Sequence, residues 1–204
     1  MIWKYKYDYK NNKKGHIYEQ KVSQAIKKAL VKKSFEYVNG GIFYYQQKAF
    51  ETDGYLISDS FLVICEIKLY QGEIVGSSTD DKLKIYNKNH KKPNFVNNPI
   101  LQAQRNLNHT FKIIGKNVPY AYLIIVPNIS DIQIKDLESH IIFITDDKID
   151  ETISMLDDFA KKQIPIINKG DVKTQLNAMK AKTNKEKKDF KKLIQKEKYE
   201  SKSN

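Results

Sequence analysis

Hydrophobic residues form two continuous runs that predict buried strands. Residues 61–67 and 118–127 are rich in Val, Ile, Leu and aromatic side chains, the composition of strands that are covered on both faces. Apolar residues with a spacing near 3.6 precede the first run, over 16–30, and separate the two runs, over 100–114. The pattern therefore predicts strands that alternate with amphipathic helices.

Shorter patterns fill in the rest of the chain. Residues 1–14 predict a loose arm or a short edge strand, and the sequence Asn39-Gly40-Gly41 predicts a turn before a strand over 42–45. Residues 77–97 are polar and predict a loop or flap, and 128–140 predict connecting structure. A short strand over 141–144 and a helix over 150–161 follow, and the core signal fades after Pro165.

The first buried run contains two charged residues. Glu66 and Lys68 are two positions apart, so on a strand they point to the same face. A buried charge is costly unless it is paired or bound to a metal. Residues 50–57 and 61–67 read as a hairpin, and if its loop is Asp59-Ser60, Asp53 lies directly opposite Glu66. Neighbouring registers leave the two acids diagonal, still within reach of one ion.

Two residues on the helices extend this group. Glu19 lies in or near the first turn of the helix over 16–30 and borders its apolar face. Asn98-Pro99 is a helix start signal, and Gln102 follows one turn later. The structural alternatives stay open, because an acid near a helix N-terminus is also favoured by the helix dipole. Lys68 can likewise serve only as the ion-pair partner of Glu66.

Charge indicates a polyanionic partner. The chain has 204 residues and a net charge of +12, which favours nucleic acid over an anionic membrane surface. Residues 171–204 hold 11 lysines against 5 acids, so half of the excess lies there. No apolar run approaches the roughly 20 residues that span a bilayer, and no signal-peptide segment begins the chain. With a single cysteine, Cys65, the sequence predicts a cytoplasmic protein.

Hydrolysis of a phosphodiester needs chemistry that these side chains can support. Mg²⁺ prefers oxygen ligands, usually one or two carboxylates, and it lowers the pKa of bound water. Asp53, Glu66 and the main-chain carbonyl of Ile67 are candidate ligands, and Glu19 can complete the shell or place a second ion. Lys68 can orient the attacking water or stabilise charge on the phosphate.

Four short motifs occur in an order that is typical of one family. They are Gly15-His16-Ile17-Tyr18-Glu19, Glu51-Thr52-Asp53, Glu66-Ile67-Lys68 followed by Gly72 and Gly76, and Asn98-Pro99-Ile100-Leu101-Gln102. In these motifs the chain resembles the nuclease-related domain (NERD) family, a branch of the PD-(D/E)XK nuclease superfamily. The resemblance covers about residues 15–125. One departure is Tyr18, which stands where the first motif has its second glycine.

The resemblance implies a fold, an activity and a site. It implies a restriction-endonuclease-like α/β core, with a central mixed β-sheet flanked by helices. It implies Mg²⁺-dependent cleavage of DNA, with Mn²⁺ as a substitute ion, and a site of Glu19, Asp53, Glu66 and Lys68 supported by Gln102. We divide the chain into an arm over 1–14, a nuclease-like domain over 15–165, and a basic helical or disordered extension over 166–204.

Other functions remain open at this stage. The fold can hold nucleic acid or a protein partner without turnover, or it can act on RNA or on particular nucleic-acid structures. We expect DNA rather than RNA as the partner, and no membrane. A homodimer and a helicase-type partner both stay open.

Overall fold

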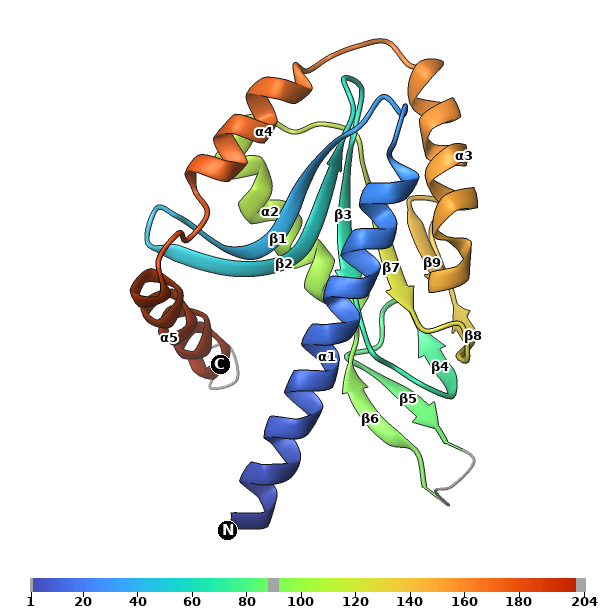
Figure 1. Cartoon of the computed structure of the whole chain (residues 1–204), viewed down its shortest axis with the longest axis vertical. Coiled ribbons are helices and arrows are strands. Elements are labelled where there is room, and N and C mark those ends of the chain that lie inside the picture. Colours follow the sequence, from blue (N-terminus) through green and yellow to red (C-terminus); the bar gives the residue numbers. More distant parts are fainter. Residues whose placement is uncertain (1, 88–91, 201–204) are drawn as a thin grey trace.

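A five-stranded mixed sheet forms the centre of the molecule (Figure 1). This computed structural model describes residues 2–87 and 92–200, with side chains over 13–87 and 92–195. The strand order is β1-β2-β3-β7-β9, in which β1, β2 and β3 are antiparallel and β3, β7 and β9 are parallel. The strands are β1 (Glu36–Tyr45), β2 (Lys48–Ile57), β3 (Leu62–Ile67), β7 (Tyr120–Val126) and β9 (Ile141–Thr145).

A second mixed sheet lies below the first in Figure 1. Its order is β6-β5-β4-β8, with β4 (Glu73–Ser77), β5 (Lys82–Tyr86), β6 (Asn94–Asn97) and β8 (Asp131–Lys135). The predicted loop over 77–97 and connection over 128–140 are therefore wrong, except for 88–91, which lie outside the described residues. The strands form because Leu83 and Ile85 alternate with exposed lysines. Leu83 packs with Ile74 and Val126 in a small core, and Ile85 pairs with Ile74 across the sheet.

Helices cover both faces of the central sheet. α1 (Ile2–Ala29) and α3 (Ile149–Lys161) pack on one face, and α2 (Pro99–Ile114) and α4 (Lys169–Ala178) pack on the other. Figure 1 shows α1 and α3 side by side in front of the strands. The observed α/β architecture confirms the predicted fold class. The loose arm or edge strand over 1–14 is wrong, because α1 extends back to Ile2.

The chain beyond Pro165 contributes to the core, contrary to expectation. Ile167, Val172 and Leu176 are buried against the face that α2 covers. α5 (Asn184–Glu200) then packs beside the β1–β2 hairpin, where Phe190 stacks on Tyr44 with ring centroids 4.4 Å apart. The weak hydrophobic pattern beyond Pro165 did not predict this packing, because α4 needs only a few apolar residues to cover a sheet face that is already apolar.

The glycines at 40 and 41 also differ from expectation. They lie inside β1 and form no turn. A Cβ at Gly40 would lie 2.4 Å from both the carbonyl carbon and the oxygen of Asp53. Because β1 and β2 approach so closely there, only glycine fits.

A buried acid joins α3 to the segment that enters β1. The side chain of Asp157 is fully buried, and it accepts hydrogen bonds from the backbone and hydroxyl of Ser34. Lys161 lies 2.6 Å from the other carboxylate oxygen. Burial by itself would raise the pKa of Asp157, but the hydrogen bonds from Lys161 and Ser34 outweigh it and lower the pKa to about 2.

Asp157→Asn should therefore destabilise the fold at neutral pH by about 2 kcal/mol, the typical value of hydrogen bonds to a charged group. A carboxyl whose pKa is lowered on folding stabilises above its unfolded pKa, and this stabilisation disappears as the pH falls toward about 2. Urea unfolding of both proteins from pH 7 to pH 2 measures the difference. A gap that stays constant down to pH 2 would contradict the assignment.

Candidate active site

The β2–β3 hairpin has the predicted register. Gly54 pairs with Cys65 and Ile57 with Leu62, and Ser58 N donates to Phe61 O, which leaves Asp59-Ser60 as the two-residue loop. Continued by one position, this register places Asp53 opposite Glu66. The predicted juxtaposition of the two acids is confirmed, because a carboxylate oxygen of each lies within 4 Å of Lys68 Nζ.

The two acids and Lys68 form one polar cluster. Lys68 Nζ lies 2.9 Å from Glu66 Oε2 and 3.7 Å from Asp53 Oδ2. Asp53 Oδ2 also accepts a hydrogen bond of 2.7 Å from the backbone N–H of Ile67. The side chain of Glu66 is fully buried, whereas those of Asp53 and Lys68 are 16% and 21% exposed. The cluster therefore has a buried base and a partly open mouth.

Burial and charge pairing act against each other in this cluster. Burial raises the pKa of Glu66 to about 8, although Lys68 and Asn106 favour the ionised carboxylate. Burial would lower the pKa of Lys68, but attraction to Glu66 and Asp53 outweighs it, so the pKa lies above its usual range. Lys68 thus carries its charge at neutral pH, beside a carboxyl group whose pKa lies close to neutral.

Asn106 is a member of the site that the sequence analysis missed. It lies on α2, is buried, and donates from Nδ2 to Glu66 Oε1 at 3.0 Å and to the carbonyl of Glu51 at 2.7 Å. Both oxygens of Glu66 are therefore hydrogen-bonded, one by Asn106 and one by Lys68. A signal was present, since Asn106 is a polar residue on the apolar stripe that includes Ala103, Leu107 and Thr110.

Asn106→Ala should destabilise the protein by about 1–3 kcal/mol, because Glu66 Oε1 and the carbonyl of Glu51 each lose a donor in a buried place. Asn106→Asp should destabilise more, since it places a second carboxylate against Glu66. Equilibrium unfolding in urea tests both. Asn108→Ala, an exposed position on the same helix, is the matched control, and an equal effect there would contradict a specific role for Asn106.

Asn98 explains why Asn-Pro begins α2. Its side-chain oxygen accepts from Ile100 N at 3.0 Å, and its amide donates to the carbonyls of Ser77, Ser78 and Asp80. One buried side chain thus caps the helix and ties it to the second sheet. Gly72 also has a structural explanation. Its φ is +113°, and a Cβ there would lie 2.3 Å from the carbonyl oxygen of Tyr86, so the backbone requires glycine.

Glu19 and Gln102 lie nearer the edge of the site. Burial raises the pKa of Glu19, repulsion from Asp53 adds to this effect, and Lys68 and His16 oppose it. Its side chain is 43% exposed and lies 3.6 Å from His16 Nδ1. Glu19 is therefore within electrostatic reach of the cluster without a direct hydrogen bond to it. Gln102 is half-buried on α2, and its side chain makes no hydrogen bond to the described residues.

The residues offer a donor set that suits a hard cation. Asp53 and Glu66 place two carboxylates side by side, and a nearby cation would offset the burial that raises the pKa of Glu66. Over residues 13–87 and 92–195, whose side chains the structure describes, no group of three or more His, Cys, Asp or Glu side chains is arranged to hold a metal. A cation here would thus bind to few protein ligands and retain several waters, as Mg²⁺ commonly does.

Comparison with protein families agrees with the fold and the motifs. The α/β core is consistent with a nuclease-like fold, and Asp53, Glu66 and Lys68 cluster where the pairing of β2 with β3 ends. Residues 14–127, more than half of the chain, match the nuclease-related domain family, and the chain belongs to this NERD family. No curated protein and no solved structure matches it. In the part of the chain that the structure describes, no helix is long and apolar enough to cross a membrane.

Proposed function

We propose that this protein is a Mg²⁺-dependent endonuclease that hydrolyses phosphodiester bonds of DNA. The observation that carries the proposal is the charged cluster at the end of β3. Glu66 is fully buried, and Lys68 lies 2.9 Å from it while staying partly open to solvent. A simple surface ion pair would need neither a fully buried carboxylate nor a second acid beside it. Burying Glu66 next to Asp53 costs free energy, and such an arrangement is typical of functional sites.

Each residue has a role in the proposed reaction. Asp53, Glu66 and the carbonyl of Ile67 would hold Mg²⁺, which when bound screens the phosphate and lowers the pKa of water. The ammonium group of Lys68 is placed to donate a hydrogen bond to the attacking water or to a phosphate oxygen. Asn106 holds the Glu66 carboxylate in position through its amide. Glu19, with its raised pKa, can hold a proton close to the reacting groups.

A cluster of lysines supports a nucleic-acid partner. Burial lowers the pKa of Lys180, and repulsion from Lys187 and Lys27 lowers it further. The three lysines come from α1, from α5 and from the segment between α4 and α5. Lys180 Nζ donates to the carbonyl of Asn39 in β1 at 2.9 Å. A phosphate backbone beside β1 would relieve this repulsion and release counterions on binding.

The test is cleavage of supercoiled plasmid DNA by the purified full chain. We expect nicking or linearisation that requires Mg²⁺ and stops with EDTA, and that Glu66→Gln abolishes. Glu66→Gln should also remove Mg²⁺ binding in calorimetry, since the amide replaces a charged ligand with a neutral one. Salt-sensitive DNA binding without cleavage by any metal would instead support a non-catalytic binding module.

A further inference from the structure

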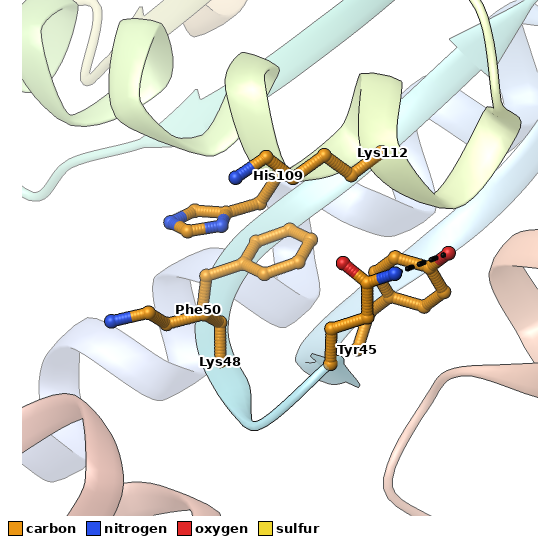
Figure 2. A pocket seen from close by; sticks show the side chains of 6 residues that line it. Tyr45, Lys48, Phe50, His109 and Lys112 are labelled. Atoms are coloured by element: carbon orange, nitrogen blue, oxygen red, sulfur yellow. Dashed lines mark hydrogen bonds between the residues drawn. The ribbon is translucent and has the colours of Figure 1, made fainter.

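A cavity of about 150 Å³ lies between the tip of the β1–β2 hairpin and the last turns of α2. Its lining combines aromatic rings with cations and an amide: Tyr45, Gln46, Lys48, Phe50, His109 and Lys112. The imidazole of His109 stacks on Phe50, with ring centroids 5.2 Å apart and planes 17° from parallel. In the view of Figure 2 the imidazole lies above the phenyl ring, and the Lys48 side chain extends beside the pair. Aromatic faces beside ammonium groups suit a base with its phosphates.

The hairpin turn that forms one wall has an unusual backbone. Gln46 and Gln47 occupy the two turn positions between paired Tyr45 and Lys48, and their φ values are +47° and +65°. This turn normally selects Asn and Gly, because positive φ costs larger side chains about 1 kcal/mol or more each. At this turn Gln46 donates a hydrogen bond from Nε2 to the hydroxyl of Tyr45 at 3.2 Å, which is the dashed line in Figure 2. The turn thus holds an amide at the edge of the cavity.

One side of α2 connects this cavity with the cluster around Glu66. Gln102, Arg105, His109 and Lys112 follow one another at intervals of three and four residues, which places them along one stripe of the helix. Asn106, which contacts Glu66, lies six residues before Lys112 on the same helix. This separation is less than two turns, a rise of roughly 9 Å along the axis. A nucleic-acid strand laid along this stripe would reach the cavity within a few nucleotides of the cluster.

We propose that this cavity binds an unpaired nucleotide of the DNA strand that the Glu66 cluster cleaves. The base stacks against the outer face of His109, and Lys48 and Lys112 contact the flanking phosphates. This inference rests on the proposed function, and it names the substrate class. Bases inside a duplex are covered by their neighbours, so a single stacked base is available only at a flap, gap, overhang or loop.

Binding of fluorescent oligonucleotides to the full chain, in EDTA so that no cleavage occurs, tests the proposal. Lys48→Ala/Lys112→Ala should weaken binding of a single-stranded oligonucleotide by about tenfold and reduce its salt slope by about 1.4, the value for two phosphate contacts. Affinity for a blunt duplex should change far less. The matched control is Lys135→Ala/Lys162→Ala, which removes the same charge from exposed positions outside the cavity.

Substitutions at His109 test the contribution of stacking separately from that of the lysine charges. His109→Ala should weaken single-strand binding by about tenfold, and His109→Phe should restore it, because the phenyl ring keeps a stacking face. Equal binding by the cavity variants and the control would overturn the proposal, as would equal losses on blunt duplex and single strand. Because no cleavage is measured, these outcomes are independent of the proposed activity. Loss of cleavage in Glu66→Gln with unchanged oligonucleotide binding would support the two assignments separately.

Discussion

Lys68→Met is expected to reduce DNA cleavage by about a hundredfold or more, the usual effect of removing one group that stabilises charge in a transition state. The ammonium group lies 2.9 Å from Glu66 and 3.7 Å from Asp53, and it is the cation that the described structure places inside the cluster. Methionine keeps much of the length and apolar contact of the lysine stem, so the change removes mainly the charge. Initial rates of plasmid nicking at saturating Mg²⁺ measure the effect.

The same substitution should leave the protein folded. Removing one partner of a buried ion pair often costs several kcal/mol, because the other charge is left unpaired. Here burial already raises the pKa of Glu66 to about 8, so its carboxyl group can take up a proton when Lys68 is absent. Unfolding in urea should therefore show a small loss up to about pH 8 and a larger one above it, where Glu66 of the native protein ionises beside Lys68 and Glu66 of the variant has no cation to pair with.

Lys173→Met is the matched control for Lys68→Met. Lys173 also pairs with a glutamate, at 2.7 Å from Glu36, but both side chains are about 40% exposed. An exposed pair contributes about 0–1 kcal/mol, so stability and cleavage should both stay close to those of the native protein. If Lys68→Met cleaves DNA as fast as Lys173→Met, Lys68 has no catalytic role and serves only as the ion-pair partner of Glu66.

Gly40→Ala is expected to have a large effect on stability, a loss of more than about 2 kcal/mol. The added Cβ would lie 2.4 Å from the carbonyl carbon and oxygen of Asp53. These are backbone atoms of a paired strand, so relief requires β1 and β2 to separate. Because the displaced residue is Asp53, cleavage should fall as well, in proportion to the shift of its carboxylate from Lys68.

Gly15→Ala is the control for this second prediction. Gly15 lies within α1, and apart from the helix's own neighbouring backbone no heavy atom lies within 4 Å of the place that an added Cβ would take. Alanine at a helix-interior position should stabilise by about 0.5–1 kcal/mol. Thermal and urea unfolding of the two variants should thus move in opposite directions. A Gly40→Ala protein as stable as the native chain would contradict the close approach of the two strands.

The sequence predicted the central part of the site because its cause is local. Asp59-Ser60 is a two-residue loop, and a loop of this length sets the register of the strands on either side. With that register, Asp53 and Glu66 had to meet, and Lys68 had to share their face. The start of α2 was predictable for the same reason, since Asn98 and Pro99 act on the backbone within two residues.

Features that depend on distant partners were not predictable. The strands over 82–86 and 131–135 are short and half polar, and they are ordered by pairing with β4 from both sides. α4 carries few apolar residues, and its burial depends on a sheet face that β1 and β2 supply. A polar residue on an apolar helix stripe, such as Asn106, does not reveal its partner in the sequence. Only the fold shows that its side chain contacts Glu66 and the carbonyl of Glu51.

The sequence by itself thus determined which acids and which lysine share one face at the end of β3, because strand periodicity and a short loop leave one consistent register. Tertiary structure alone decided what surrounds them. Asn106 arrives on α2, Glu19 approaches from α1 on the opposite side of the sheet, and Gly40 lets β1 pass close to Asp53. These contacts join residues far apart in the chain, so their energies depend on packing that no local pattern records.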